Sequence, residues 1–365
     1  MGQPPFRADH VGSLLRPARL LDMRRAHEAG RLSSDALREA EDAAIADALA
    51  LQERVGLGVA TDGEMRRRSY HSYFFGQLGD IVPDFVPADA TSDARGRGVQ
   101  PVARIGSRIA RAKPIHLDDY RALAAATRLA PKITIPGPCA LHFRGGDAAI
   151  LKSAYDDVGA FWDDIVAAFR AELADLAAAG CRYVQMDETA FAKFGDPHVQ
   201  ATLAARGEDW RKTIDLYVAM TNRVLADAPA GLRIGVHLCR GNRGGQHHAE
   251  GGYEEVAETL FNALATDLFL LEYDSPRAGD FTPLRFLPKD RAVVLGLVST
   301  KTPALERKDD LKRRIDEAAR FVALDQLALS PQCGFASVDV GNPVSPADQE
   351  AKLRLVTQTA RDVWG

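Results

Sequence analysis

Eight short apolar runs, most of them followed by a segment of helical periodicity, constrain the fold of this chain more than any other feature. The runs are aliphatic and β-branched without strict apolar–polar alternation, as expected for strands buried on both faces of a parallel sheet. Repeated strand–helix alternation favours a (β/α)8 barrel, the TIM barrel, over a doubly wound sheet. The expected strands are Asp9–Ser13, Gly58–Glu64, Ile133–Pro138, Tyr183–Glu188, Ile234–Cys239, Leu268–Asp274, Val293–Val298 and Leu327–Cys333.

Helical patterns lie between most of these runs. Ser34 is the expected N-cap of a helix that carries Leu37 and Ile45 and ends near Gly56. A single barrel domain over residues 1–365 accommodates this number of elements. The further expected helices are Ala160–Ala179, Trp210–Ala226, Tyr253–Leu264, Ala304–Phe321 and Pro346–Trp364.

Two stretches interrupt the alternation. Residues 76–131 separate the second and third strands by far more than a normal connection, so we expect an insertion there. Within it, Val99–Ile109 has alternating apolar residues, which predicts a hairpin over the barrel mouth. The second stretch, residues 240–252, contains five glycines and is expected to be a mobile active-site loop. It lacks the GK[ST] of a phosphate-binding loop, which argues against nucleotide binding.

Charge and composition exclude several classes of partner. The 46 lysines and arginines against 50 aspartates and glutamates give a net charge of −4, which indicates neither nucleic-acid binding nor a basic membrane surface. No stretch approaches the ~18 apolar residues of a membrane span, and the N-terminal residues lack the apolar core of a signal peptide. The four cysteines are too few for a disulfide framework. We expect a soluble, cytoplasmic protein without membrane or nucleic-acid partners.

One His, two Cys and one Glu stand at strand ends in the second half of the chain. His237 and Cys239 in HLC lie two residues apart and so project to the same face of a strand. Glu272 in FLLEYD and Cys333 in SPQCG end two later strands. In a barrel these ends meet at one rim, and together the four side chains would make a zinc shell. The alternative is that both cysteines pack as small hydrophobes and His237 is a core histidine.

This ligand set indicates a chemistry. A zinc ion held by thiolates, with room for an incoming ligand, binds a substrate thiol as thiolate and makes it a nucleophile at neutral pH. The set therefore points to S-alkyl transfer.

Other histidines and cysteines compete for the role of ligand. His247 and His248 lie in the glycine-rich loop, where holding a metal would cost ordering entropy, so solvation is the simpler interpretation. Cys181 begins a strand and is interpreted as a core residue. Cys139 follows the Pro-Gly-Pro turn after the third strand, where it either packs or lines the pocket.

Polar residues also end the first, second and fourth strands. Ser13, Glu64 and Asp187 are expected to face the same mouth as the metal set. The two carboxylates suit a substrate ammonium group, and Ser13 with the Gly12–Ser13 backbone suits a carboxylate, so the mouth would hold an amino acid with a thiol tail. The alternative is that both carboxylates form salt bridges with neighbouring arginines such as Arg66, Arg67 or Arg68.

With these motifs in place, the chain resembles the catalytic half of cobalamin-independent methionine synthase, over nearly its whole length. The resemblance implies a (β/α)8 barrel that binds zinc and homocysteine. The third-strand segment ITIPGP also resembles the motif of that family. The resemblance assigns zinc to His237, Cys239, Glu272 and Cys333, and the amino-acid end of homocysteine to Gly12, Ser13, Glu64 and Asp187.

The sequence departs from the family where the methyl donor binds. A folate-stacking tryptophan after the third strand has no equivalent in CALHFRGG, and a glutamate that contacts the pterin is replaced by Lys193. A histidine proposed as proton donor is replaced near Lys301, which becomes the candidate catalytic residue. The second, N-terminal barrel of the full-length enzymes has no counterpart in this sequence. The chain is therefore more similar to the short, single-barrel homologues.

We therefore expect a zinc-dependent S-methyltransferase that acts on homocysteine with a donor other than folate polyglutamate. The alternative is a thiol alkyltransferase of the coenzyme M kind, or one that takes its methyl group from a corrinoid protein. Glu64 and Asp187 favour an α-amino acid thiol, because a sulfonate brings no ammonium group. A porphyrinogen-decarboxylase-like barrel would leave the metal set unexplained, and a silent binding barrel would be expected to have lost part of it.

Overall fold

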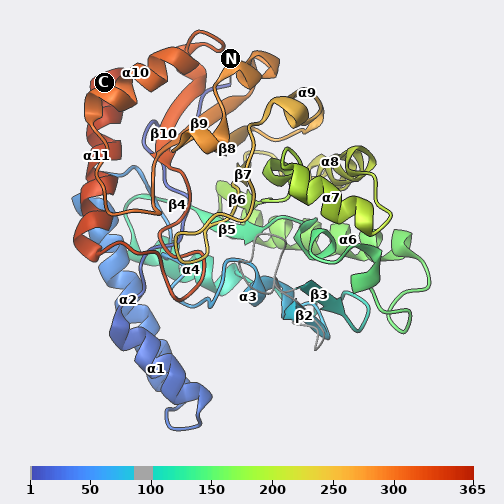
Figure 1. The fold of residues 1–365 in the computed structure, drawn as a ribbon. Helices are drawn as coiled ribbons and strands as arrows, with labels where there is room; N and C mark the ends of the chain where they lie inside the picture. Colours follow the sequence, from blue (N-terminus) through green and yellow to red (C-terminus); the bar gives the residue numbers. More distant parts are fainter. Residues whose placement is uncertain (1, 86–101) are drawn as a thin grey trace.

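A parallel six-stranded sheet forms the centre of the protein in the computed structural model, which describes residues 2–85 and 102–365 (Figure 1). The strand order is β10-β9-β8-β7-β6-β5, so each strand lies beside its neighbour in sequence, as right-handed βαβ connections produce. The strands are β5 (Ile133–Pro136), β6 (Tyr183–Asp187), β7 (Arg233–Leu238), β8 (Leu268–Glu272), β9 (Ala292–Val298) and β10 (Leu327–Pro331).

Shorter pairings continue the parallel order at both ends of this sheet. At the β5 end, β1 (Val59–Ala60) pairs with β4 (Ala130–Pro131), which directly precedes β5. At the other end, Ala8 forms a single parallel bridge with Leu329 of β10. The protein thus has the expected α/β fold, but its described strands form separate sheets rather than one continuous closed ring.

The expected first strand, Asp9–Ser13, is the main difference from the sequence-based expectation, because it forms no regular ladder. The Asp9 carboxylate accepts a hydrogen bond from the His10 backbone at 2.7 Å, and Gly12 has a φ of 138°. The positive φ of Gly12 takes the segment out of strand geometry. The segment still runs beside the strand-end region of β1, since the Leu14 amide donates to the Gly63 carbonyl at 3.0 Å.

The parallel strands are buried on both faces, which explains why their sequences do not alternate. On one face, a small cluster of side chains from several strands packs together with Phe6. The other face packs against the helices in a much larger hydrophobic cluster. The members of the small cluster are Val59, Tyr183, Leu268, Leu270, Ala292, Val294 and Ala328.

Helices cover the outer face of the sheet, with α10 and α11 beside β9 and β10 and α6 and α8 beside the middle strands (Figure 1). Two of the observed helices have the bounds that the sequence predicted, Trp210–Ala226 and Pro346–Trp364. The N-cap of α2 is Ser33 rather than Ser34, because its hydroxyl accepts the Ala36 amide hydrogen bond. The helices are α1 (Ala18–Glu28), α2 (Ser34–Arg54), α3 (Ser72–Phe75), α4 (Leu117–Ala126), α5 (Ala140–Phe143), α6 (Val158–Ala178), α7 (Pro197–Ala205), α8 (Trp210–Ala226), α9 (Glu254–Ala263), α10 (Lys308–Ala318) and α11 (Pro346–Trp364).

The expected insertion contains its own hairpin. Strand β2 (Ile81–Phe85) pairs antiparallel with β3 (Val102–Ile105), and Ile81 lies opposite Ile105. The sequence placed the whole hairpin within Val99–Ile109, but only β3 of the observed pair falls in that range, and its partner β2 precedes it in the chain. Residues 99–101 lie outside the described part of the chain. No helix in the described ranges is both long and apolar enough to cross a membrane.

A fully buried ion pair ties the first segment of the chain to the sheet. The Lys132 ammonium, between β4 and β5, donates to the Asp9 carboxylate at 2.7 Å and to the Gln185 amide oxygen at 3.1 Å. The Asp9 carboxylate also accepts the Tyr183 hydroxyl at 2.7 Å. Because these groups have no contact with water, removing one partner leaves an uncompensated charge.

We predict that Lys132→Met lowers the free energy of unfolding by about 3–5 kcal/mol, the usual cost of breaking a buried pair. Urea denaturation followed by circular dichroism measures the change. The matched control is Arg25→Met, which removes an exposed ion pair with Asp22 and should leave the midpoint nearly unchanged. Equal midpoints for the two variants would show that the Lys132 network does not hold the fold together.

Candidate metal and substrate site

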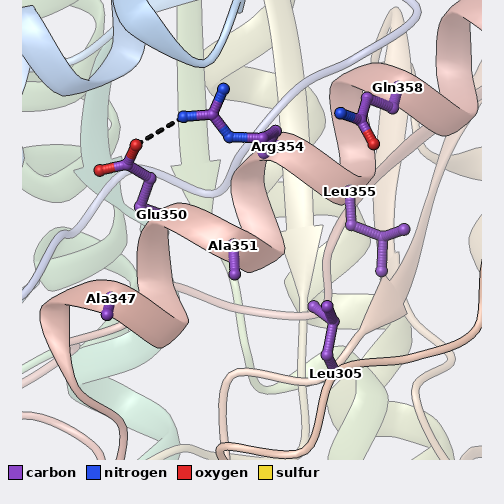
Figure 2. A pocket seen from close by; sticks show the side chains of 7 residues that line it. All are labelled: Leu305, Ala347, Glu350, Ala351, Arg354, Leu355 and Gln358. Atoms are coloured by element: carbon purple, nitrogen blue, oxygen red, sulfur yellow. Dashed lines mark hydrogen bonds and ion pairs between the residues drawn. The ribbon is translucent and has the colours of Figure 1, made fainter.

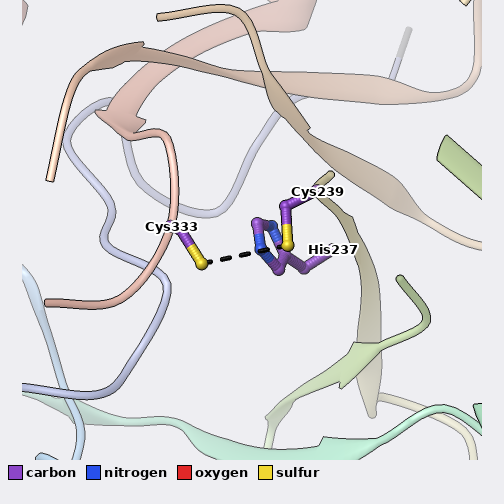
Figure 3. Close-up of side chains that lie close together, drawn as sticks. All are labelled: His237, Cys239 and Cys333. Atoms are coloured by element: carbon purple, nitrogen blue, oxygen red, sulfur yellow. Dashed lines mark hydrogen bonds between the residues drawn. The ribbon is translucent and has the colours of Figure 1, made fainter. Parts of the chain in front are cut away.

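Three of the four expected metal ligands meet at the carboxyl-terminal end of the sheet (Figure 3). His237 lies in β7, Cys239 follows that strand directly, and Cys333 comes two residues after β10. Their ligand atoms all lie within 4.8 Å of one another, and the two sulfur atoms are 3.9 Å apart. All three residues are buried. The distances suit side chains that surround one small cation.

The donor atoms of this group fit a metal ion such as zinc. The Nδ1 atom of His237 lies 3.2 Å from the Leu270 carbonyl, which orients the ring and directs Nε2 inwards. The Nε2 atom is buried and has no hydrogen-bond partner among the described residues. A buried imidazole nitrogen without a partner, beside two thiols, is the arrangement that a tetrahedral N/S site requires.

The two thiols influence each other's ionisation. Contact with the Cys333 thiol lowers the pKa of Cys239, while the same contact, together with burial, raises the pKa of Cys333. The pair thus ionises in two steps, and Cys239 loses its proton first. A bound divalent cation would favour the deprotonated form of both.

Glu272, the fourth expected ligand, lies outside this group because its carboxylate is held elsewhere. One oxygen accepts hydrogen bonds from Lys301 Nζ at 3.2 Å and from Arg277 Nη2 at 3.0 Å. The other oxygen accepts the Arg240 backbone amide. Burial alone would raise the pKa of Glu272, but Lys301 and Arg240 lower it to about 2.

Lys301, the candidate proton donor, therefore has a defined neighbour. It lies beyond the end of β9, and its side chain is largely buried against Glu272. Burial opposes its charge, but the Glu272 and Asp274 carboxylates raise its pKa above the ordinary value. An ammonium group with a raised pKa is a weaker acid, so this environment favours a role as fixed positive charge. Its part in proton transfer stays a prediction.

Glu64 adopts a strained backbone conformation. It is the one non-glycine residue of the described ranges with a positive φ, of 59°. Its Oε1 atom accepts the Thr134 hydroxyl at 2.9 Å and lies 3.9 Å from Arg67, so part of the expected salt-bridge alternative is present. Its Oε2 atom is buried with no hydrogen-bond partner in the described structure. Strain at a buried carboxylate with one uncompensated oxygen is characteristic of binding sites.

Asp187 is held in place by a chain of hydrogen bonds. The Lys132 ammonium can only donate, so it fixes the oxygen of the Gln185 amide, and the Gln185 nitrogen then donates to Asp187 at 2.7 Å. Asp187 lies opposite His237 in the register of β6 and β7. Burial raises its pKa to about 6, although nearby His237 lowers it, so the group is mainly ionised at neutral pH.

Ser13 faces the segment that carries Cys333. A Cβ atom added to Gly334 would lie 1.9 Å from the Ser13 hydroxyl, so only glycine allows this approach. At Gly12, an added Cβ would lie 2.6 Å from Thr134, and the φ of 138° already favours glycine. The Gly-Ser pair thus fits closely between the first segment and the end of β10.

A cavity of about 1110 Å³ joins these residues. Its walls include Ser13, Glu64, Asp187, His237, Cys239 and Cys333, whereas Gly12, Glu272 and Lys301 do not line it. A smaller hollow of about 410 Å³ lies on the surface of α11 and is lined by none of the expected site residues (Figure 2). The two charged side chains in its wall, Glu350 and Arg354, form a hydrogen bond with each other. The large cavity is therefore the candidate substrate site.

The cavity also contains residues that sequence reasoning did not assign to the site. Lys193 lines it with its ammonium group 5.3 Å from the Phe143 ring centroid, and burial lowers its pKa to about 8. In the glycine-rich loop, His248 lines the cavity, while His247 contacts Glu250 at 3.0 Å. Asn242 of this loop donates to the Gly334 carbonyl at 2.9 Å and so ties the loop to the segment after Cys333.

Comparison with known proteins agrees with this geometry. The family described as cobalamin-independent synthase, catalytic domain, matches residues 6–345. The protein YxjH of Bacillus subtilis, itself uncharacterized, is 40% identical over 99% of this chain and 95% of its own length.

Two solved structures also match. A candidate vitamin-B12-independent methionine synthase of Listeria monocytogenes has a TM-score of 0.70 at 30% identity, covering 100% of this chain and 99% of its own. A B12-independent methionine synthase of Shewanella sp. W3-18-1, solved with selenomethionine, has a TM-score of 0.75 at 19% identity over 98% of this chain and 97% of its own.

The protein belongs to the cobalamin-independent methionine synthase family and carries its catalytic domain. The family consists of methyltransferases, and at family level the reaction is methyl transfer to homocysteine. None of the comparisons supports a corrinoid protein as partner.

We predict that the purified protein binds one zinc ion and that Cys239→Ser loses most of it, because a hydroxyl is a far poorer zinc ligand than a thiolate. Metal content per chain, measured by mass spectrometry after dialysis, tests this. Cys181→Ser is the matched control, since Cys181 is equally buried but lies outside the cluster. Retention of full zinc content by Cys239→Ser would show that the cluster is not the metal site.

Proposed function

We propose that the protein is a zinc-dependent S-methyltransferase whose acceptor is the thiol of homocysteine. The observation that carries the proposal is that one cavity contains both a His–Cys–Cys cluster and two buried carboxylates. The cluster suits a thiol, and the carboxylates suit the ammonium group of the same molecule. A (β/α)8 barrel is the architecture that we propose for the complete ring, in line with the parallel pairings at both ends of the sheet.

Two groups of residues would bind the two ends of the substrate. His237, Cys239 and Cys333 would hold the zinc ion, which, when bound, supplies the positive charge that makes a thiol acidic at neutral pH. Asp187 and the unpartnered oxygen of Glu64 would accept hydrogen bonds from the substrate ammonium group. The Ser13 hydroxyl, next to Gly334, would donate to the substrate carboxylate.

The acceptor is better matched by an α-amino acid thiol than by a sulfonate thiol. A sulfonate would bring negative charge towards Glu64 and Asp187 without an ammonium group to compensate them. The Shewanella protein was solved with selenomethionine, which is also an α-amino acid and carries selenium in its side chain. For this reason we favour homocysteine over thiols of the coenzyme M kind.

We predict that Glu64→Gln and Asp187→Asn each weaken homocysteine binding at least about tenfold while zinc content stays unchanged, because each removes one partner of a desolvated charge pair. Isothermal titration of the zinc form with homocysteine measures this. Glu41→Gln is the control, since Glu41 is a buried carboxylate that pairs with Arg24 outside the cavity. Unchanged affinity in both site variants would refute the assignment of the ammonium site.

We further predict that methyltetrahydrofolate triglutamate is a poor methyl donor. Transfer from its tertiary amine needs a proton on the leaving nitrogen, and the Lys301 ammonium, paired with Glu272, is a weak acid. A kcat/KM below about 10⁴ M⁻¹s⁻¹ in steady-state assays is expected, under the range of most natural substrates. A sulfonium donor, which needs no such proton, is the comparison. A higher value with the triglutamate would identify the folate as a natural donor.

A further inference from the structure

One arginine near the start of the chain contacts two segments of the candidate substrate site. The Arg16 guanidinium donates to the Glu64 carbonyl at 3.0 Å through Nη2 and to the Arg67 carbonyl at 3.1 Å through Nε. Through Nη1 it donates to the Ala336 carbonyl at 2.6 Å. Ala336 lies three residues after Cys333. A single side chain is thus bonded both to the turn that carries Glu64 and to the segment that carries Cys333.

The Arg16 side chain is buried and charged. It is 7% exposed, and every hydrogen bond that it donates in the described structure goes to a backbone carbonyl. Burial lowers the pKa of Arg16 to about 10, although the Glu64 carboxylate opposes this shift, so the group stays charged at neutral pH. The planar guanidinium holds its donors in fixed directions, and it therefore fixes the positions of the carbonyls relative to one another.

The contact at Glu64 supports a strained residue. Glu64 has a φ of 59°, and a non-glycine residue keeps a left-handed conformation only where the surrounding structure fixes it. Arg16 bonds to the carbonyl of this same residue, while the Leu14 amide bonds to the carbonyl of Gly63 before it. The direction of the Glu64 carboxylate therefore depends on the segment that contains Arg16.

Another contact between the two segments lies further from the site residues. Ser69 forms an antiparallel bridge with Val338. This pairing keeps the segments together, but along the chain it is further from both Glu64 and Cys333 than the contacts of Arg16 are. The relative position of the two site residues is thus fixed more directly by Arg16.

We propose that Arg16 is a positioning residue that sets the spacing between the ammonium-binding carboxylate of Glu64 and the thiol-binding end of the cavity at Cys333. The inference rests on the proposed function, in which one amino acid spans both ends. Homocysteine and cysteine differ by one methylene group between the α-carbon and the sulfur atom, so a fixed spacing discriminates between them. One methylene group is worth about 10- to 200-fold in a well-formed pocket.

The test compares the dissociation constants of homocysteine and cysteine, measured by isothermal titration of the zinc form. The parent should bind homocysteine at least about tenfold more tightly than cysteine. Arg16→Met should lower this ratio to about threefold or less with unchanged zinc content, because the two segments can then shift relative to each other. Arg16→Lys should lower it as well, since one ammonium group cannot replace the fixed donors of the guanidinium.

The control removes a buried cation elsewhere. Lys352 is fully buried, donates to the Ala304 carbonyl, pairs with Glu306 at 3.1 Å and does not line the cavity. Lys352→Met should destabilise the fold, because it leaves Glu306 without its partner, but it should keep the parent's ratio. The proposal is overturned if Arg16→Met keeps the parent's ratio, or if Lys352→Met lowers the ratio equally. If Arg16→Met does not fold, the ratio of Arg16→Lys decides in the same way.

Failure of the proposed function gives a different result. If the zinc form of the parent binds neither thiol, the assignment of the acceptor is wrong, and the role of Arg16 is wrong with it. If the parent prefers homocysteine and both Arg16 variants keep that preference, the function stands and only the role of Arg16 is wrong.

Discussion

The register of the parallel sheet is the constraint on which the candidate site depends. Backbone hydrogen bonds place Asp187 opposite His237 on adjacent strands, and β8, β9 and β10 follow in order. Parallel strands present their carboxyl ends at the same edge, so a shift of one residue in either strand would turn that strand's site residue, His237 or Asp187, towards the opposite face. Residues far apart in the sequence line the cavity because the sheet brings the ends of their strands to one edge. Loops on either side of that edge supply the remaining lining residues.

A second requirement is the compensation of buried charge. Glu64 and Asp187 in the cavity wall, and Glu272, Lys132 and Arg67 around it, are almost all without contact with water. The desolvation cost of each buried charge is offset by a neighbour of opposite charge or by a hydrogen-bond donor. The chain from Lys132 through Gln185 to Asp187 links the fold's stability to the direction of a binding group.

Much of this arrangement could be predicted from the sequence. The ends of the strands can be predicted because apolar runs stop at polar residues. The His-x-Cys spacing places both side chains on the same face of a strand. For these reasons the meeting of His237, Cys239 and Cys333 was predictable. The direction of the Glu272 side chain was not, because it depends on Lys301 and Arg277 in loops whose approach only the tertiary structure determines. Lys132, a single charge between apolar residues, was a signal that sequence reasoning passed over. The irregular first segment was equally hidden, since its apolar residues fit a strand although Gly12 interrupts it.

The left-handed backbone of Glu64 limits the substitutions that evolution could accept at this position. Glycine adopts such a conformation freely, and asparagine and aspartate do so more readily than other residues. Branched or bulky side chains would add strain to the loss of the carboxylate. Mutational drift at this position is thus confined to a few residue types, of which aspartate keeps the charge. In divergent relatives, a glycine, asparagine or aspartate aligned with Glu64 would therefore indicate that the turn has been retained. A carboxylate at this position would indicate that the amino-acid specificity has been retained.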